Sequence, residues 1–272
     1  MKDNTALPIY HAWQGIVSDY SGRNLTKIGD KLTALSGLAR LVAESLSIKP
    51  EYYVAGLWKD DLASGLLWYI IHPKEPNRAL PYRAPTWSWA SVNGKISYFH
   101  EQYQFLFKTL LKIHNAHCSP SPLDPFGRVT SGQISATGIL VYVSLHICPN
   151  NPNRTKEYTG KGGCARYPYS DQFSWVCLHP TPQYPKPYFY EVLLDDRMEA
   201  ESLLVERYAC LLVGKHWDSK TGGCRTWWLV LRQTLRNENY WERIGIGYFH
   251  EYSRILRLFN GKAAKKTTVI II

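Results

Sequence analysis

The spacing of apolar residues predicts helices in the first part of the chain. One apolar face recurs at steps of three and four residues from Leu25 onward, as in an amphipathic helix. Thr26 suits the N-cap of this helix, and Pro50 bars its continuation. Two further helices are expected at about 52–58 and 62–71. The apolar face consists of Ile28, Leu32, Leu35, Leu38, Ala39 and Val42.

A change of period marks the segment that follows. Trp87–Val92 and Lys95–Phe99 flank Asn93-Gly94, a dipeptide typical of tight β-hairpins. Because side chains alternate along a strand, this hairpin would place the indoles of Trp87 and Trp89 on one face.

Most of the remaining chain favours strands. Gln133–Ile147 is a long extended run with apolar residues on both faces, and 105–113 fits either a strand or a short helix. Aromatic content of 14%, with ten Trp and nineteen Tyr, also favours a sheet-rich core. Further strands are expected at about 187–194, 203–213, 226–233, 243–250 and 267–272.

These patterns together predict an α+β fold. A short N-terminal helical segment, residues 1–72, would pack on a mostly antiparallel, β-rich domain of sandwich or barrel-like form at 86–272. Residues 73–85 hold four prolines and form a connector. Residues 148–186 hold six prolines and a Gly160-Lys161-Gly162-Gly163 patch, so they are expected to form an irregular excursion.

Composition indicates a globular chain with an uneven charge. Among 272 residues, 45% are hydrophobic and the mean hydropathy is −0.29. The formal net charge is +10, and it falls entirely within residues 73–272. Basic surfaces favour anionic partners, including nucleic acid. However, only Lys262, Lys265 and Lys266 form a cluster, so a solvated surface is preferred to nucleic-acid binding.

The cysteines and the apolar runs bear on the compartment. None of the six cysteines belongs to a C-x-x-C pair, the N-terminus does not resemble a secretion signal, and no apolar run approaches the ~20 residues that span a bilayer. Free thiols in a reducing compartment are therefore expected, which favours a cytoplasmic protein without membrane attachment.

Four segments, in order, resemble fungal heterokaryon-incompatibility (HET) domain proteins. Residues 13–26, WQGIVSDYSGRNLT, resemble the family's W-x-x-V-x-x-Y-S-x-R-x-L-T segment. Residues 30–39, DKLTALSGLA, resemble D-K-L-x-A-L-S-G-L-A. Residues 53–58 and 66–68 resemble Y-x-A-G-L-W followed by L-L-W. Residues 83–92, RAPTWSWASV, resemble R-A-P-S-W-S-W-A-S-V, with Thr86 in place of serine.

The resemblance implies the region C-terminal to the HET domain proper. Segments like W-I-D-x-x-C-I-x-Q and R-x-W-T-x-Q-E, which mark the HET domain itself, do not occur in these residues. The family implies a role in fungal self/non-self recognition linked to cell death. We therefore expect a non-enzymatic scaffold whose protein partner is a HET domain or another incompatibility factor. Its oligomeric state is left open.

Metal sites receive weak support from the sequence. Structural zinc sites usually combine close Cys/His pairs. Only one close pair, Cys177 and His179, occurs among the candidate ligands Cys164, Cys177, His179, His216 and Cys224. A second group, His114, His117 and Cys118, is better explained as a solvated loop. No metal ligand is assigned.

Catalytic and cofactor motifs are not apparent either. The sequence lacks G-x-S-x-G, H-E-x-x-H, G-x-x-x-x-G-K-[ST] and G-x-G-x-x-G. The Gly160–Gly163 patch is read as a flexible loop and Asp195-Asp196 as part of a turn. No catalytic residue and no cofactor is therefore assigned.

Several polar and aromatic residues allow both a structural and a functional reading. Asp30 is expected as a first-turn helix carboxylate, rather than a contact with a HET domain. Arg83 is expected to stack on an aromatic ring and to bond backbone carbonyls, rather than an anion or NAD. The interface between helical segment and sheet is expected to contain Trp58, Trp68, Trp87 and Trp89.

Two alternatives remain open at this point. The four tryptophans could line the site of an NAD-consuming or hydrolytic enzyme, which would require a polar cleft. Alternatively, the basic β-rich region could bind anions or nucleic acid.

Overall fold

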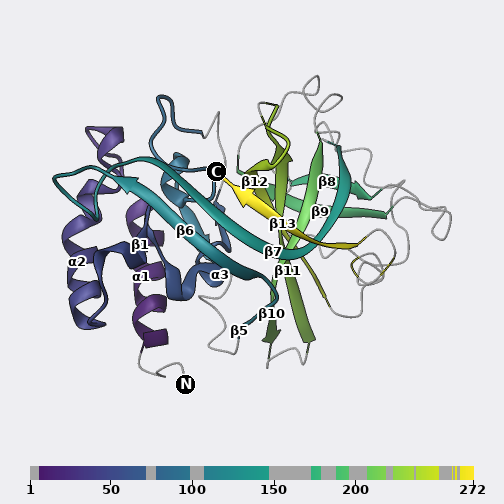
Figure 1. Ribbon diagram of the computed structural model, residues 1–272, viewed down its shortest axis with the longest axis horizontal. Coiled ribbons are helices and arrows are strands. Elements are labelled where there is room, and N and C mark those ends of the chain that lie inside the picture. The colour runs from purple at the N-terminus through teal and green to yellow at the C-terminus, as the bar shows by residue number, and fades with distance from the viewer. Residues whose placement is uncertain are drawn as a thin grey trace.

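The computed structural model has the predicted α+β, β-rich architecture (Figure 1). A helical part lies on one side of the molecule, and a large, mostly antiparallel sheet forms the other. The structure describes residues 6–71, 78–98, 107–146, 173–178, 188–195, 207–218, 223–235, 237–250, 259, 261 and 264–272.

The first helix, α1 (Ala6–Ser21), precedes the helix that was predicted. Its residues Tyr10, Trp13 and Val17 are buried at the three- and four-residue steps of one helix face. Ser21, at its end, accepts a hydrogen bond from the backbone N–H of Ile96, 2.9 Å away, which attaches α1 to the strand region.

The helix predicted from Thr26 is mostly replaced by tighter turns. Two 3₁₀ turns, Ile28–Asp30 and Thr33–Leu35, precede α2 (Ser36–Ser45). Lys27, not Thr26, precedes the first turn, and no side chain caps it. The buried set is Leu32, Leu35, Ala39 and Ala43, whereas Ile28 and Leu38 are exposed.

The helix predicted at 52–58 is wrong. A 3₁₀ turn at Pro50–Tyr52 is followed by a hairpin of strands β1 (Tyr53–Val54) and β2 (Leu57–Trp58). The two connecting residues, Ala55 and Gly56, have φ values of 45° and 93°. Positive φ at both central positions is the geometry of a tight hairpin turn and is incompatible with a right-handed helix.

The helix predicted at 62–71 is only partly correct. A 3₁₀ turn at Lys59–Asp61 leads into α3 (Leu62–Gly65), and the chain then enters strand β3 (Trp68–Ile70). Strand β3 pairs with β4 (Ile96–Tyr98). Five consecutive buried residues, Ser64–Trp68, show that this segment is covered on all sides, so helical periodicity could not be read from it.

The hairpin predicted at Trp87–Val92 is also wrong in one arm. Trp89–Ser91 form a 3₁₀ turn, and β4 pairs with β3 instead. The Ser88 hydroxyl accepts a hydrogen bond from the N–H of Ala90 at 3.0 Å and so caps the turn. Serine side chains compete with strand pairing in this way. Gly94 retains the positive φ, 89°, expected of the Asn-Gly dipeptide.

The predicted strands of the second part are confirmed where the structure describes them. Of 105–113, residues 107–109 and 112–113 lie in strands rather than a helix, whereas 105–106, like 203–206, lie outside the described residues. Residues 173–178 form a strand inside the predicted excursion; the rest of 148–186 lies outside the described residues. The strands are β5 (Phe107–Thr109), β6 (Lys112–Pro120), β7 (Val129–His146), β8 (Phe173–Leu178), β9 (Tyr188–Leu194), β10 (Tyr208–Asp218), β11 (Gly223–Gln233), β12 (Tyr240–His250) and β13 (Lys265–Ile271).

Six of these strands close into a ring, which is the barrel-like form of the prediction. The pairings run β7–β8–β9–β12–β11–β10 and return from β10 to β7. Strand β13 pairs antiparallel with β7 and parallel with β12 over two residues. Strands β5 and β6 extend the sheet beyond the ring.

Strand β7 contributes to two separate cores. Ile134, Ala136 and Leu140 belong to a core shared with the helical part, whereas Val141 and Val143 belong to a second cluster with residues of β9, β10, β11 and β12. The first core contains residues of α1, α2 and α3 and of strands β1 to β4. The helical part and the sheet therefore share one hydrophobic core.

Within the part of the chain that the structure describes, no helix is both long and apolar enough to cross a membrane.

Candidate functional site: the tryptophan junction

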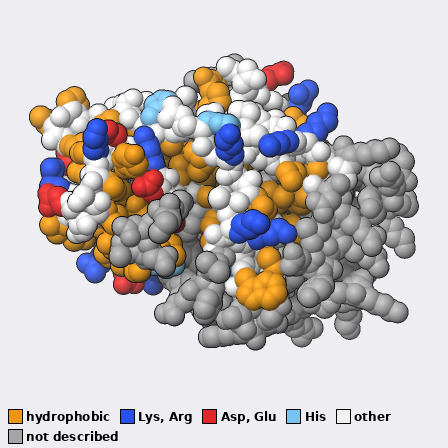
Figure 2. All heavy atoms as spheres, turned by 60° about the horizontal axis from the view of Figure 1, so that its bottom comes forward, with side chains coloured by type: hydrophobic (Ala, Val, Ile, Leu, Met, Phe, Trp, Pro, Cys, Tyr) orange, Lys and Arg blue, Asp and Glu red, His pale blue; other side chains and the backbone are white. Residues whose placement is uncertain are grey.

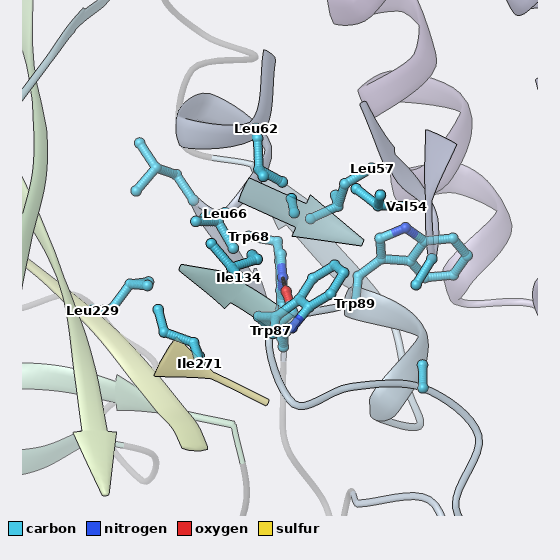
Figure 3. Packing of buried hydrophobic residues seen from close by; sticks show 14 of the residues in the cluster. Val54, Leu57, Leu62, Leu66, Trp68, Trp87, Trp89, Ile134, Leu229 and Ile271 are labelled. Atoms are coloured by element: carbon cyan, nitrogen blue, oxygen red, sulfur yellow. Dashed lines mark hydrogen bonds between the residues drawn. The ribbon is translucent and has the colours of Figure 1, made fainter. Parts of the chain in front are cut away.

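The four tryptophans predicted at the interface between the helical part and the sheet are all buried in the shared core. Trp68 contacts Arg243 of β12, whereas the ring contacts of Trp58 are with Tyr10, Trp13 and Tyr53 of the helical part. Trp58, Trp68, Trp87 and Trp89 are each at most 2% exposed. We call these four residues the tryptophan junction. Figure 3 shows three of them among apolar residues of both parts, which contribute Val54, Leu57, Leu62 and Leu66 on one side and Ile134, Leu229 and Ile271 on the other.

The indoles of the junction bond to backbone oxygens. The Nε1 atoms of Trp89 and of Trp13 both donate to the carbonyl of Gly56, each at 3.0 Å. Trp68 Nε1 donates to the carbonyl of Trp87 at 3.0 Å. A Cβ at Gly56 would lie 2.4 Å from Trp89 Nε1, so the close approach requires glycine.

The indole N–H groups of the other two tryptophans do not donate to a backbone oxygen in this way. The Nε1 atoms of Trp58 and Trp87 are buried without a hydrogen-bond partner in the structure. The hydroxyl of Tyr53, whose ring centroid lies 5.1 Å from that of Trp58, is in the same state. Burying such groups unpaired costs about 1–3 kcal/mol each.

Arg83 connects three segments through backbone carbonyls, as predicted. Its Nε donates to Ala90 at 2.5 Å, its Nη2 to Val92 at 2.6 Å and its Nη1 to Ile28 at 3.2 Å. It is 7% exposed. The predicted bonding to carbonyls is thus confirmed. The predicted stacking on an aromatic ring is not seen for Arg83 among the described residues. Instead Lys31, which sequence reasoning did not single out, lies over the ring of Trp89.

Lys31 is a buried amine next to a buried guanidinium. Its Nζ donates to the carbonyl of Val92 at 2.8 Å, the same oxygen that Arg83 uses, and lies 5.3 Å from the Trp89 ring centroid. Burial, and secondly the charge of Arg83, lowers the pKa of Lys31 to about 7. Burial likewise lowers the pKa of Arg83 to about 10.

A buried ion pair joins the ring to the helical part. Arg243 of β12 and Asp195, which follows β9, are 0% and 1% exposed, and Arg243 Nε lies 2.9 Å from Asp195 Oδ2. The same guanidinium donates to the carbonyls of Leu66 at 2.7 Å and Trp68 at 2.5 Å. Its Cζ lies 3.4 Å from the Trp68 ring centroid.

Arg78 approaches the Asp195 carboxylate as a second cation. Its Nη2 lies 3.7 Å from Asp195 Oδ2, and its Nη1 donates to Ser91 Oγ at 2.8 Å. Burial lowers the pKa of Arg243, although the charge of Asp195 opposes that effect. The Asp195 turn predicted from sequence is a bend, and its carboxylate is an ion-pair partner rather than a solvated turn residue. Asp196 lies outside the described residues.

Asp30 is not a helix-capping carboxylate. It ends the 3₁₀ turn Ile28–Asp30, and its Oδ1 accepts a hydrogen bond from Arg128 Nη2 at 2.6 Å. Because no α-helix begins at this point, no helix dipole acts on Asp30. The pair attaches the loop between β6 and β7 to the helical part.

The candidate metal ligands do not converge. Among the described residues, no three His, Cys, Asp or Glu side chains are grouped as a metal would require. His216 lies opposite Arg225, and Cys224 lies opposite Trp217, so His216 and Cys224 face opposite sides of the sheet. Cys164, His179 and the Gly160–Gly163 patch lie outside the described residues, as does the side chain of Cys177.

The second predicted group lies on a strand rather than in a loop. His114, His117 and Cys118 belong to β6, whose pairing with β7 is interrupted by a register shift between Ile113 and Asn115. His114 Nε2 shares a 2.7 Å hydrogen bond with Thr137 Oγ1. Burial raises the pKa of Cys118 to about 12, which disfavours the thiolate that binds metals.

The junction is therefore organised to hold segments of chain together. Around it, Lys31, Arg83 and Arg243 bind backbone carbonyls, and Arg243 also binds the buried carboxylate of Asp195. The tryptophan rings belong to the shared hydrophobic core. Comparison with models of protein families finds no match, and neither curated proteins nor solved structures match the chain.

Proposed function

We propose that the chain is a non-enzymatic scaffold and interaction region of a heterokaryon-incompatibility-type protein. In this proposal it acts in the cytoplasm, in fungal self/non-self recognition linked to cell death. Its partner is a protein, a HET domain or another incompatibility factor, rather than nucleic acid. The observation that carries the proposal is the meeting of all four family-like segments at the tryptophan junction.

Each segment contributes a contact to another at this place. Trp13 of the first bonds Gly56 of the third, and Trp89 of the fourth bonds the same carbonyl. Lys31 of the second bonds Val92 of the fourth. The spacing and types of residues in these segments thus have a structural explanation that needs no substrate.

The hydrogen bonds that the buried arginines make within the chain support a scaffold rather than a binding site. A residue that binds substrate or nucleotide must keep hydrogen-bonding capacity for it. Arg83 makes four hydrogen bonds, three to carbonyls and one to Asn93 Oδ1 at 3.1 Å. Arg243 makes hydrogen bonds to two carbonyls and to both oxygens of Asp195.

A binding experiment with an enzymatic readout tests the proposal. The chain is titrated by calorimetry with a purified HET domain from a fungal protein that carries all four segments downstream of that domain. Separate samples of the chain alone are incubated with NAD and assayed for nicotinamide. We expect saturable binding, with nicotinamide release by the chain alone no higher than in buffer.

Two results would overturn the proposal. The chain would be an enzyme if nicotinamide release rose with chain concentration and if the NAD-cleaving activity co-eluted with the protein on gel filtration. Failure to bind any HET domain of such proteins, with the chain folded by its tryptophan fluorescence, would remove the proposed partner.

A further inference from the structure

Strands β6, β7 and β13 present a polar face on the side away from the shared core. Along β7, Ile134, Ala136 and Gly138 are buried, whereas Thr137 belongs to the alternate, outward set. The register places Lys112 and Thr268 on either side of Thr137, and the exposed Lys266 opposite Ile139, where this side of β7 begins to pack against the second core. We call this surface the polar face, defined by Lys112, His114, His117, Thr137, Lys266 and Thr268.

The centre of the polar face is a short chain of hydrogen bonds. His114 Nε2 and Thr137 Oγ1 are 2.7 Å apart, and Thr137 Oγ1 and Thr268 Oγ1 are also 2.7 Å apart. These bonds cross all three strands, with Lys112 in the same cross-strand row as the two threonines. The hydroxyls and the imidazole are thereby held in fixed positions between two lysines.

The charge of this surface is of one sign. Strands β6, β7 and β13 contain no Asp or Glu, and Lys112, Lys266, His114, His117 and Thr268 are all exposed. The loop between β6 and β7 contains one acid, Asp124, and it lies 3.6 Å from Arg40. In Figure 2 pale blue histidine side chains and blue basic side chains lie near one another in the upper part of the view, with a red acidic side chain at its upper edge.

We propose that the polar face binds an acidic, extended segment of a partner polypeptide. Carboxylates of a partner would pair with the two lysines, and strands β6, β7 and β13 contain no Asp or Glu that would compete for them. The hydroxyls and the amides of neighbouring outward residues Asn115 and Gln133 can bond the peptide groups between those carboxylates. The inference depends on this surface alone and does not require the proposed function.

The side chains favour polypeptide over nucleic acid. Proteins that bind single strands combine positive charge with aromatic side chains on which bases stack. The outward positions of β6, β7 and β13 between Lys112 and Ser119, Ser131 and Ile139, and Lys266 and Ile270 hold no Phe, Tyr or Trp. Two lysines separated by hydroxyls match spaced carboxylates better than a continuous row of phosphates.

Fluorescence anisotropy with the full chain tests the inference. The probes are a labelled peptide of alternating glutamate and serine, the matching peptide of glutamine and serine, and a labelled oligonucleotide. The variant Lys112→Glu/Lys266→Glu reverses the charge of the polar face. The control Lys27→Glu/Lys49→Glu makes the same change of net charge at two exposed lysines of the helical part.

The glutamate peptide is expected to bind, more weakly as salt is raised. The polar-face variant should lose about tenfold or more in affinity, which corresponds to about 1.4 kcal/mol. The control variant should change by less than about twofold, since long-range charge is screened. Equal losses in the two variants, equal binding of the neutral peptide, or tighter binding of the oligonucleotide that is lost in Lys112→Glu/Lys266→Glu would each overturn the inference.

Discussion

Replacing Lys31 by methionine should change how stability depends on pH. The amine is 5% exposed, shares the Val92 carbonyl with Arg83, and burial lowers its pKa to about 7. In the unfolded chain an ordinary lysine titrates near ~10.4. Between these values the unfolded state holds a proton that the folded state has released, so stability rises with pH across this window.

The size of the effect follows from the two pKa values. Each pH unit inside the window adds about 1.4 kcal/mol to the free energy of unfolding. Between pH 6 and 9 the contribution of Lys31 should therefore grow by about 2–3 kcal/mol. Below pH 6 both states are protonated and the contribution is constant. Methionine has a similar length and no charge, so Lys31→Met removes this dependence.

The assay is urea unfolding followed by tryptophan fluorescence at pH 6, 7, 8 and 9. The wild-type minus Lys31→Met difference in unfolding free energy isolates the amine from other titrating groups. Lys49→Met is the matched control, because Lys49 is 78% exposed and only 3.9 Å from Glu51 in a surface pair. A wild-type minus Lys31→Met difference constant within about 0.5 kcal/mol over this range would refute the reasoning, since an ordinary lysine does not titrate there.

Two further predictions concern the tryptophan junction. Trp89→Ala should lower the free energy of unfolding by about 3–5 kcal/mol, because a fully buried indole and its bond to Gly56 are lost; Leu235→Ala, at a site 82% exposed, is the control, and equal midpoints in urea would contradict the prediction. Arg243→Met should cost about 3–5 kcal/mol by stranding the buried Asp195 carboxylate, and adding Asp195→Asn should restore part of that loss in the same assay. Equal stability of the single and double variants would argue against the ion pair.

Part of the sheet could be predicted from alternation, since residues 133–140 of β7 alternate between part-exposed and buried positions. Strand β11 has six consecutive buried residues and was recognised by its residue types instead. The segments around Tyr53 and Leu66 could not be predicted, because their side chains are buried on every side and periodicity disappears. At Trp87–Val92 the alternation was present, but the hydroxyl of Ser88 formed a turn instead.

The polar contacts of the junction were predictable only where the residue type restricts the partner. Arg83 was expected to bond carbonyls because its planar guanidinium carries five donors. Asp195 and Arg243 are 48 residues apart, and the carbonyls that Arg243 binds are 175 and 177 residues away. Pairs so distant in sequence leave no local pattern, so the fold must be known before they can be found.

The division of β7 between two cores has a consequence for dissection of the chain. Because β7 contributes residues to both hydrophobic cores, neither core is complete when β7 is removed. A fragment containing only the helices would expose the apolar surface that Ile134 and Ala136 normally cover, which favours aggregation. Limited proteolysis within β7 should thus release no compact half of the molecule.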